Sequence, residues 1–127
     1  MDKFTLRTKI LQTLKENMIK FINELIVLLP NEPDMMVLRI MFAEQIAMED
    51  AVALINERVW KYREMVYKKD DAFFLAKEDI FSGLQGDKVS YFKRLWQSDI
   101  DDDNREAIWL WFLKFIHIVE KYNATFD

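Results

Sequence analysis

The chain has 127 residues, of which 51% are hydrophobic and 31% charged, so it can bury one core and is not a disordered segment. It has no cysteine, which excludes disulfides and thiolate metal sites, and its two glycines and two prolines favour long helices over many short strands. The net charge of −4 and the pI near 5.1 argue against general binding of polyanions.

The first predicted helix runs from about Thr5 to Leu29, because its apolar residues recur at intervals of three and four. The residues expected on its buried face are Leu11, Leu14, Met18, Ile22, Leu25 and Leu29. Pro30 should end this helix, since the residue before a proline avoids the helical conformation.

A second helix is predicted to begin at Pro33, with Asn31 or Glu32 near its cap. Its expected inner face consists of Val37, Leu38, Met41 and Phe42. A third helical stretch starts near Met48 and carries Val52, Ile55, Val59 and Tyr62. We expect a bend before Val66, and not one straight helix over residues 33–69.

The segment that follows, KKDDAFFLAKEDIFSGLQGDKV, contains both glycines and many acidic residues, so we expect an irregular connection with a helical turn. Its large apolar residues should be buried, and they are Phe73, Phe74, Leu75, Ile80, Phe81 and Leu84. Asp87 can then cap another helix, whose apolar stripe consists of Val89, Phe92, Leu95 and Trp96.

The last predicted helix runs from about Asp103, its expected cap, to Tyr122, and contains the apolar stretch IWLWFLKFIHI. This stretch is shorter than the about 20 apolar residues that span a bilayer, and it contains a lysine, so it is not a membrane span. A narrow polar stripe is expected from Lys114, His117 and Lys121. The residues expected to be most buried are Trp109, Phe112, Phe115, Ile116 and Val119. The fold class is therefore all-α, a single-domain bundle (residues 1–127) of five or six helices around this central helix.

No catalytic, cofactor-binding or metal-binding residue is predicted. Asp99, Asp101 and Asp103 have the spacing of a calcium loop, but its twelfth position is Leu110, where a bidentate glutamate is required. His117 is the single histidine, which rules out sites built on paired imidazoles. We therefore expect a protein that is not an enzyme.

Cations and aromatic rings gather in two segments, around residues 58–69 and 88–94. Such a mixture can grip a single strand, because bases stack on rings while phosphates pair with cations. The candidate contact residues are Arg58, Lys61, Arg63, Lys68, Lys69, Lys88, Lys93 and Arg94. Their alternative role is to form a solvated face while Trp60 and Tyr62 pack inward. A nucleic-acid-binding accessory protein is thus the alternative function.

The surplus of large apolar residues favours a different function. A chain this small has more of them than one core needs, so some are expected to meet a partner protein or a second copy. The candidate contact residues are Leu110, Trp111 and Ile118, which lie beside the polar stripe of the last helix. The favoured function is a protein–protein interaction or scaffold module.

Three segments of the chain resemble corresponding segments in a known group of proteins. They are FINELIVLLPNEPD at 21–34, VWKYREMVYKKDDAFFL at 59–75 and FKRLWQSDIDDDNREAIWLWFLKFIHIVEKY at 92–122. Their order and spacing resemble small, uncharacterised helical proteins encoded by nucleocytoplasmic large DNA viruses. The resemblance implies an all-helical fold and a place in the infected cytoplasm or in the virion, and it implies no site residue. The amino terminus also lacks the pattern of a secretory signal, so we expect a protein that is not secreted.

Overall fold

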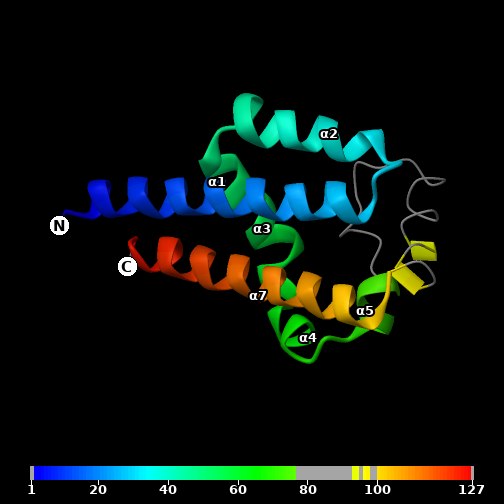
Figure 1. The fold of residues 1–127 in the computed structure, drawn as a ribbon. Coiled ribbons are helices and arrows are strands. Elements are labelled where there is room, and N and C mark those ends of the chain that lie inside the picture. Colours follow the sequence, from blue (N-terminus) through cyan, green and yellow to red (C-terminus); the bar gives the residue numbers. More distant parts are fainter. Residues whose placement is uncertain (1, 77–92, 95, 98–99, 127) are drawn as a thin grey trace.

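A computed structural model of the chain describes residues 2–76, 93–94, 96–97 and 100–126. Within these ranges every regular element is helical, which confirms the all-α fold class. Figure 1 shows two long helices, α1 (Lys3–Leu28) and α7 (Asp102–Ala124), lying side by side and running in opposite directions. The shorter helices pack around this pair.

Helix α1 begins two residues earlier than predicted because Asp2 caps it. The Asp2 carboxylate accepts a hydrogen bond from the backbone N–H of Thr5 at 2.8 Å, and this bond lowers the pKa of Asp2. The helix ends at Leu28, next to Pro30, as the sequence predicts. At the far end of the pair, the Arg7 guanidinium donates to the Thr125 backbone oxygen at 2.7 Å and so ties the start of α1 to the end of α7.

Helix α2 (Pro33–Ile40) starts at the predicted proline and continues into a π-helical turn, η1 (Met41–Gln45). The predicted inner face was wrong at Val37, which is 63% exposed, while Met35 is buried. The sequence MMVLRIMF is apolar almost all round, so its spacing does not say which side faces inward. Packing on α1 decides the orientation instead.

The predicted bend is confirmed between α3 (Met48–Arg58) and α4 (Arg63–Tyr67), which a single 3₁₀ turn, η2 (Trp60–Tyr62), separates. One carboxylate of α7 binds both the 3₁₀ turn and the end of α4. Glu120 accepts a hydrogen bond from the Trp60 indole at 3.2 Å and another from the Tyr67 hydroxyl at 3.4 Å.

The predicted helical turn in the next segment is α5 (Asp71–Ala76). Leu75 packs against the core, and the buried Trp96 donates its indole N–H to Asp71 at 3.1 Å. The remaining predictions for this stretch lie outside what the structure describes: the burial of the Phe74 side chain, the helix capped by Asp87, and the buried positions Ile80, Phe81, Leu84, Val89, Phe92 and Leu95.

The core consists of two clusters, and α7 contributes buried residues to both. The first cluster joins α1, α3 and α7 through Leu14, Met18, Ala51, Val52, Ile55, Phe115, Ile118 and Val119. The second, which we call the tryptophan cluster, consists of Val66, Trp96, Ile100, Ile108, Trp109 and Ile116. The predicted central position of the last helix is thereby confirmed.

Of the five residues of this helix that were expected to be most buried, four are buried and Phe112 is only partly buried. The predicted cap was wrong: Asp101, not Asp103, accepts a hydrogen bond from the Asn104 backbone N–H at 2.8 Å. Both aspartates stand in one acidic run, and the helix starts two residues earlier than the sequence pattern suggests.

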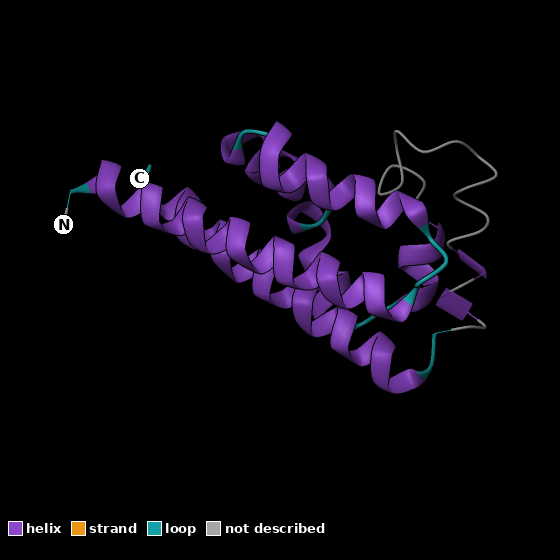
Figure 2. Cartoon of the chain, turned by 45° about the horizontal axis from the view of Figure 1, so that its top comes forward, coloured by secondary structure: helices purple, strands orange, loops and turns teal. Residues whose placement is uncertain are grey.

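The outer side of α7 faces water. Lys114, His117 and Lys121 are all exposed, which confirms the predicted polar stripe. Figure 2, which views the chain from another angle, again shows α1 and α7 as neighbours with one long side uncovered. Over the described ranges, none of the helices combines the length and the apolar character that crossing a bilayer requires.

Candidate interaction surfaces

A shallow groove runs between α1 and α7 on their uncovered side. It has a volume of about 280 Å³ and is lined by Glu24, Ala107, Leu110, Trp111 and Lys114. The Trp111 indole donates to the Glu24 carboxylate at 2.6 Å, so a hydrogen bond links the two helices across the floor of the groove. Two of the three predicted partner-contact residues, Leu110 and Trp111, therefore line one surface, which we call the α1–α7 groove.

Leu110 is the exposed large apolar residue that lines this groove, with 55% of its surface accessible. Trp111 is partly buried against Phe21 and Phe115. The third predicted contact residue, Ile118, does not belong to the surface. It is 8% exposed and lies in the first core cluster, because it is on the side of α7 that faces α3. Its assignment as a partner contact is corrected accordingly.

Val27 is a further exposed apolar side chain of α1, and the sequence prediction missed it. It is 81% exposed and lies one helical turn after Glu24 on the same face of α1. Because α1 and α7 are antiparallel and Glu24 meets Trp111, this turn of α1 lies opposite the turn of α7 that precedes Trp111. The signal was present in the sequence, since Val27 is an apolar residue that falls outside the spacing of the buried face of α1.

A second exposed apolar surface lies on α2. Met36, Val37 and Ile40 are 46%, 63% and 48% exposed, and they share the side of α2 that points away from the buried Met35. We call these three side chains the α2 face. Arg39, beside it, donates to the Asn23 side chain on α1 at 3.1 Å and so turns toward α1.

The aromatic rings of the predicted nucleic-acid surface are already in contact with other side chains. The Arg63 guanidinium lies 4.0 Å from the centre of the Trp60 ring, which also packs against the tryptophan cluster. Tyr62 packs edge-on against Phe73. Arg63 thus covers one face of the Trp60 ring, and Trp60, Lys61 and Arg63 also line an open surface hollow of about 790 Å³.

Two of the candidate cations of that surface, Lys61 and Arg63, line this hollow, and the other described ones are not among its lining residues. Lys61 and Lys68 are exposed, Arg63 lies over Trp60, and Lys69 pairs with Glu106 of α7. Arg58 is partly buried, and its Nε has no hydrogen-bond partner. Lys93 is partly buried and Arg94 exposed, whereas Lys88 lies outside the described residues.

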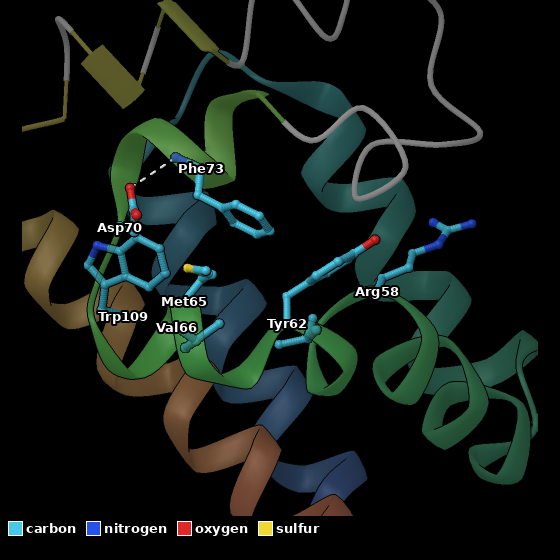
Figure 3. Close-up of a pocket in the computed structure, with 8 residues that line it drawn as sticks. Arg58, Tyr62, Met65, Val66, Asp70, Phe73 and Trp109 are labelled. Carbon is cyan, nitrogen blue, oxygen red and sulfur yellow. Dashed lines mark hydrogen bonds between the residues drawn. The ribbon is translucent and has the colours of Figure 1, made fainter.

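A small cavity lined by residues of η2 and α4 is more enclosed than the open hollows on the surface. Figure 3 shows the Tyr62, Phe73 and Trp109 rings around Met65, with the Arg58 guanidinium directed away from them. Its volume is about 10 Å³, close to the space that one water needs. The cavity is a packing gap and not a substrate site.

Among the residues that the structure places, no three histidine, cysteine, aspartate or glutamate side chains come together as metal ligands would. No protein-family model, curated protein or solved structure gives a significant match to the chain. Function therefore has to be inferred from the surfaces themselves.

Proposed function

We propose that the protein is a non-enzymatic interaction module that self-associates through the α2 face. The observation that carries this proposal is the exposure of three large apolar side chains, Met36, Val37 and Ile40, on one side of an eight-residue helix. Removing apolar surface from water is the main favourable term in protein association, and clustered exposed apolar residues mark interaction sites.

A second copy is the occupant that best fits the α2 face. A two-fold axis brings a surface against itself, so like charges on that surface would repel. The three side chains are uncharged, and Arg39 is held toward α1 by its hydrogen bond to Asn23. The face is small beside a standard interface, so we expect a weak dimer with a dissociation constant of about 10–100 μM.

Sedimentation velocity over a concentration series tests this proposal. The wild-type chain should dimerise, and Val37→Glu or Ile40→Glu should leave it monomeric, because either change places like charges across the interface. Gln12→Glu introduces the same charge at an exposed position of α1 and should leave the dimer intact. A strictly monomeric wild-type chain, or variants that dimerise as the wild type does, would contradict the proposal.

Nucleic acid is the less well supported partner, because Arg63 already lies over the Trp60 ring and Lys69 pairs with Glu106. We expect a labelled single-stranded oligonucleotide to show no saturable, salt-dependent change of anisotropy when it is titrated with the protein. Binding that weakens with salt, and that Lys61→Ala with Lys68→Ala reduces, would restore this alternative.

The setting of this module comes from the resemblance described for residues 21–34, 59–75 and 92–122. From this resemblance we expect a protein of a large DNA virus that acts in the infected cytoplasm or in the virion. Immunoblotting of purified particles and of infected-cell fractions distinguishes the two locations.

A further inference from the structure

The outward side of α7 carries four residues whose order is complementary to itself when it is reversed. Asp103, Ala107, Leu110 and Lys114 follow one another at intervals of four, three and four residues, so they lie on one narrow stripe of the helix. Asp103, Leu110 and Lys114 are exposed, and Ala107 is partly buried. We call these four side chains the α7 seam.

The α7 seam matches the same seam of a second copy that runs in the opposite direction. In an antiparallel pair of helices, the first residue of the seam faces the last one of its mate, and the second faces the third. Asp103 then meets Lys114 of the second copy, and the small Ala107 meets the large Leu110. A two-fold axis repeats both contacts, so the seam gives two ion pairs that flank two apolar contacts.

The charges of this surface argue for a second copy and against a uniformly charged partner. The α1–α7 groove is lined by one glutamate, Glu24, and one lysine, Lys114, and the seam itself holds one acid and one base. A uniformly acidic or basic helix would therefore meet a repulsive charge for each attractive one. A reversed second copy meets opposite charges at both ends of the seam, whereas a parallel one would set Asp103 against Asp103 and Lys114 against Lys114.

The fold holds the seam in a fixed position. The Trp111 indole donates to the Glu24 carboxylate at 2.6 Å and so ties α7 to α1 beside the seam. The Lys114 ammonium lies 5.0 Å from the centre of the Trp111 ring, which restricts the lysine to the edge of the groove. Asp101 and not Asp103 accepts the capping hydrogen bond of α7. Ordering these side chains in a contact therefore costs less entropy than it would on a mobile segment.

We propose that the α7 seam pairs with the α7 seam of a second copy in an antiparallel, two-fold contact. The contact is small, so we expect a dissociation constant of about 1 mM, and it is sparsely populated at the concentrations that show the α2 dimer. Figure 1 shows α1 between α2 and α7, so one copy can use both surfaces. Dimers joined through the α2 face can thus assemble further through α7.

The test uses the Val37→Glu chain, because this variant removes the proposed α2 contact and leaves the α7 seam unchanged. Sedimentation equilibrium at about 1 mM protein should find about half of the chains paired. Asp103→Lys should weaken this pairing about tenfold, because it sets lysine against lysine at both ends of the seam, and Lys114→Glu should do the same with two acids. Leu110→Ser should also weaken it about tenfold.

An equimolar mixture of the Asp103→Lys chain and the Lys114→Glu chain gives the sharpest outcome. Each chain alone carries two seam charges of one sign, but the two chains together place lysines against acids at both ends. The mixture should regain the affinity of the Val37→Glu chain to within about twofold, and so should one chain that carries both substitutions and keeps the original net charge. A mixture that associates no better than its components, or a double variant that stays weak, overturns the proposal.

Matched controls place the same charge changes outside the seam. Asp50→Lys lies in the first turn of α3 and Lys61→Glu on η2, and both positions are exposed. Neither change should alter the affinity by more than about twofold. Controls that weaken pairing as much as the seam variants do overturn the proposal. Circular dichroism checks that each variant is folded.

Failure of this inference is distinguishable from failure of the α2 face. A Val37→Glu chain that stays monomeric at about 2 mM overturns the seam contact and leaves the α2 face in place. A Val37→Glu chain that dimerises as strongly as the wild type contradicts the α2 face instead. In that case the seam contact stands if Asp103→Lys dissolves the dimer, and it fails if the dimer persists.

Discussion

Replacing Asp71 by alanine should destabilise the fold by about 2 kcal/mol, because one oxygen of this carboxylate holds two tryptophans. Asp71 Oδ1 accepts the indole N–H of Trp96 at 3.1 Å and that of Trp109 at 3.2 Å. The two rings also pack edge to face, 5.6 Å apart, within the tryptophan cluster. Loss of Asp71 therefore removes the hydrogen-bond acceptor of both tryptophans and loosens the contact between α5 and α7.

The magnitude follows from burial. Two hydrogen bonds to a charged acceptor contribute about 3–6 kcal/mol when all partners are buried. Trp96 and Trp109 are buried, but Asp71 is exposed, so water can reach part of the site after substitution and the cost falls to about 2 kcal/mol. With a urea dependence of about 1.5 kcal/mol per molar, the unfolding midpoint should fall by about 1.3 M.

Urea titration followed by tryptophan fluorescence measures this change. Asp71→Asn keeps one acceptor oxygen and should cost about half as much, and Trp96→Phe combined with Asp71→Ala should cost less than the sum of the two single changes. The reasoning is refuted if Asp71→Ala unfolds within about 0.5 kcal/mol of the wild type, or if the double variant is strictly additive.

Three other predictions concern the cap, the core and the titration of the bundle. Asp101→Ala should lower the free energy of unfolding by about 1 kcal/mol and Asp103→Ala by less than about 0.5 kcal/mol, and equal urea midpoints would contradict the capping assignment. Ile118→Ala should cost about 2–4 kcal/mol, because the side chain is buried, whereas Leu110→Ala should cost under about 1 kcal/mol; the reverse order in thermal melts would show the burial to be wrong. Burial and the carboxylate to which it donates raise the pKa of Tyr67 above 10.0. Because the folded pKa is the higher one, the stabilising contribution of this phenol is present below pH 10 and is lost as the pH rises through the raised pKa. Ultraviolet titration of the phenolate in wild type and Tyr67→Phe measures it, and a Tyr67 that titrates at or below 10.0 would refute the contact.

Local sequence patterns predicted the long helices because the signals that form and end a helix act over a few residues. The spacing of apolar side chains in α1 and α7 sets the side that each helix buries, and Pro30 and Pro33 mark where one helix ends and the next begins. The break near Trp60 was also predicted, although the sequence does not show what holds it. The acceptor for Trp60 and Tyr67 is Glu120, far along the chain, so no local pattern can reveal it.

The candidate surfaces were predictable only in part. Leu110 was predicted as a surface residue because it stands beside a polar stripe, and it is exposed. Ile118, predicted on the same grounds two turns later in α7, lies on the side of that helix that α3 covers. Val27 and the α2 face depend on which sides of α1 and α2 remain uncovered. In a helix that is apolar nearly all round, any side can face the core at similar cost, so local spacing does not choose among them.

The amino-acid sequence by itself determined that the chain is helical, where its long helices run, and that the last helix supplies the centre of the core, since periodicity, capping and proline act over one or two turns. Only the tertiary structure decided which apolar side chains remain in water and which charges lie beside them. That choice depends on contacts between helices far apart in the chain, such as Glu24 with Trp111 and Arg39 with Asn23. The surfaces proposed for function are what those contacts leave uncovered.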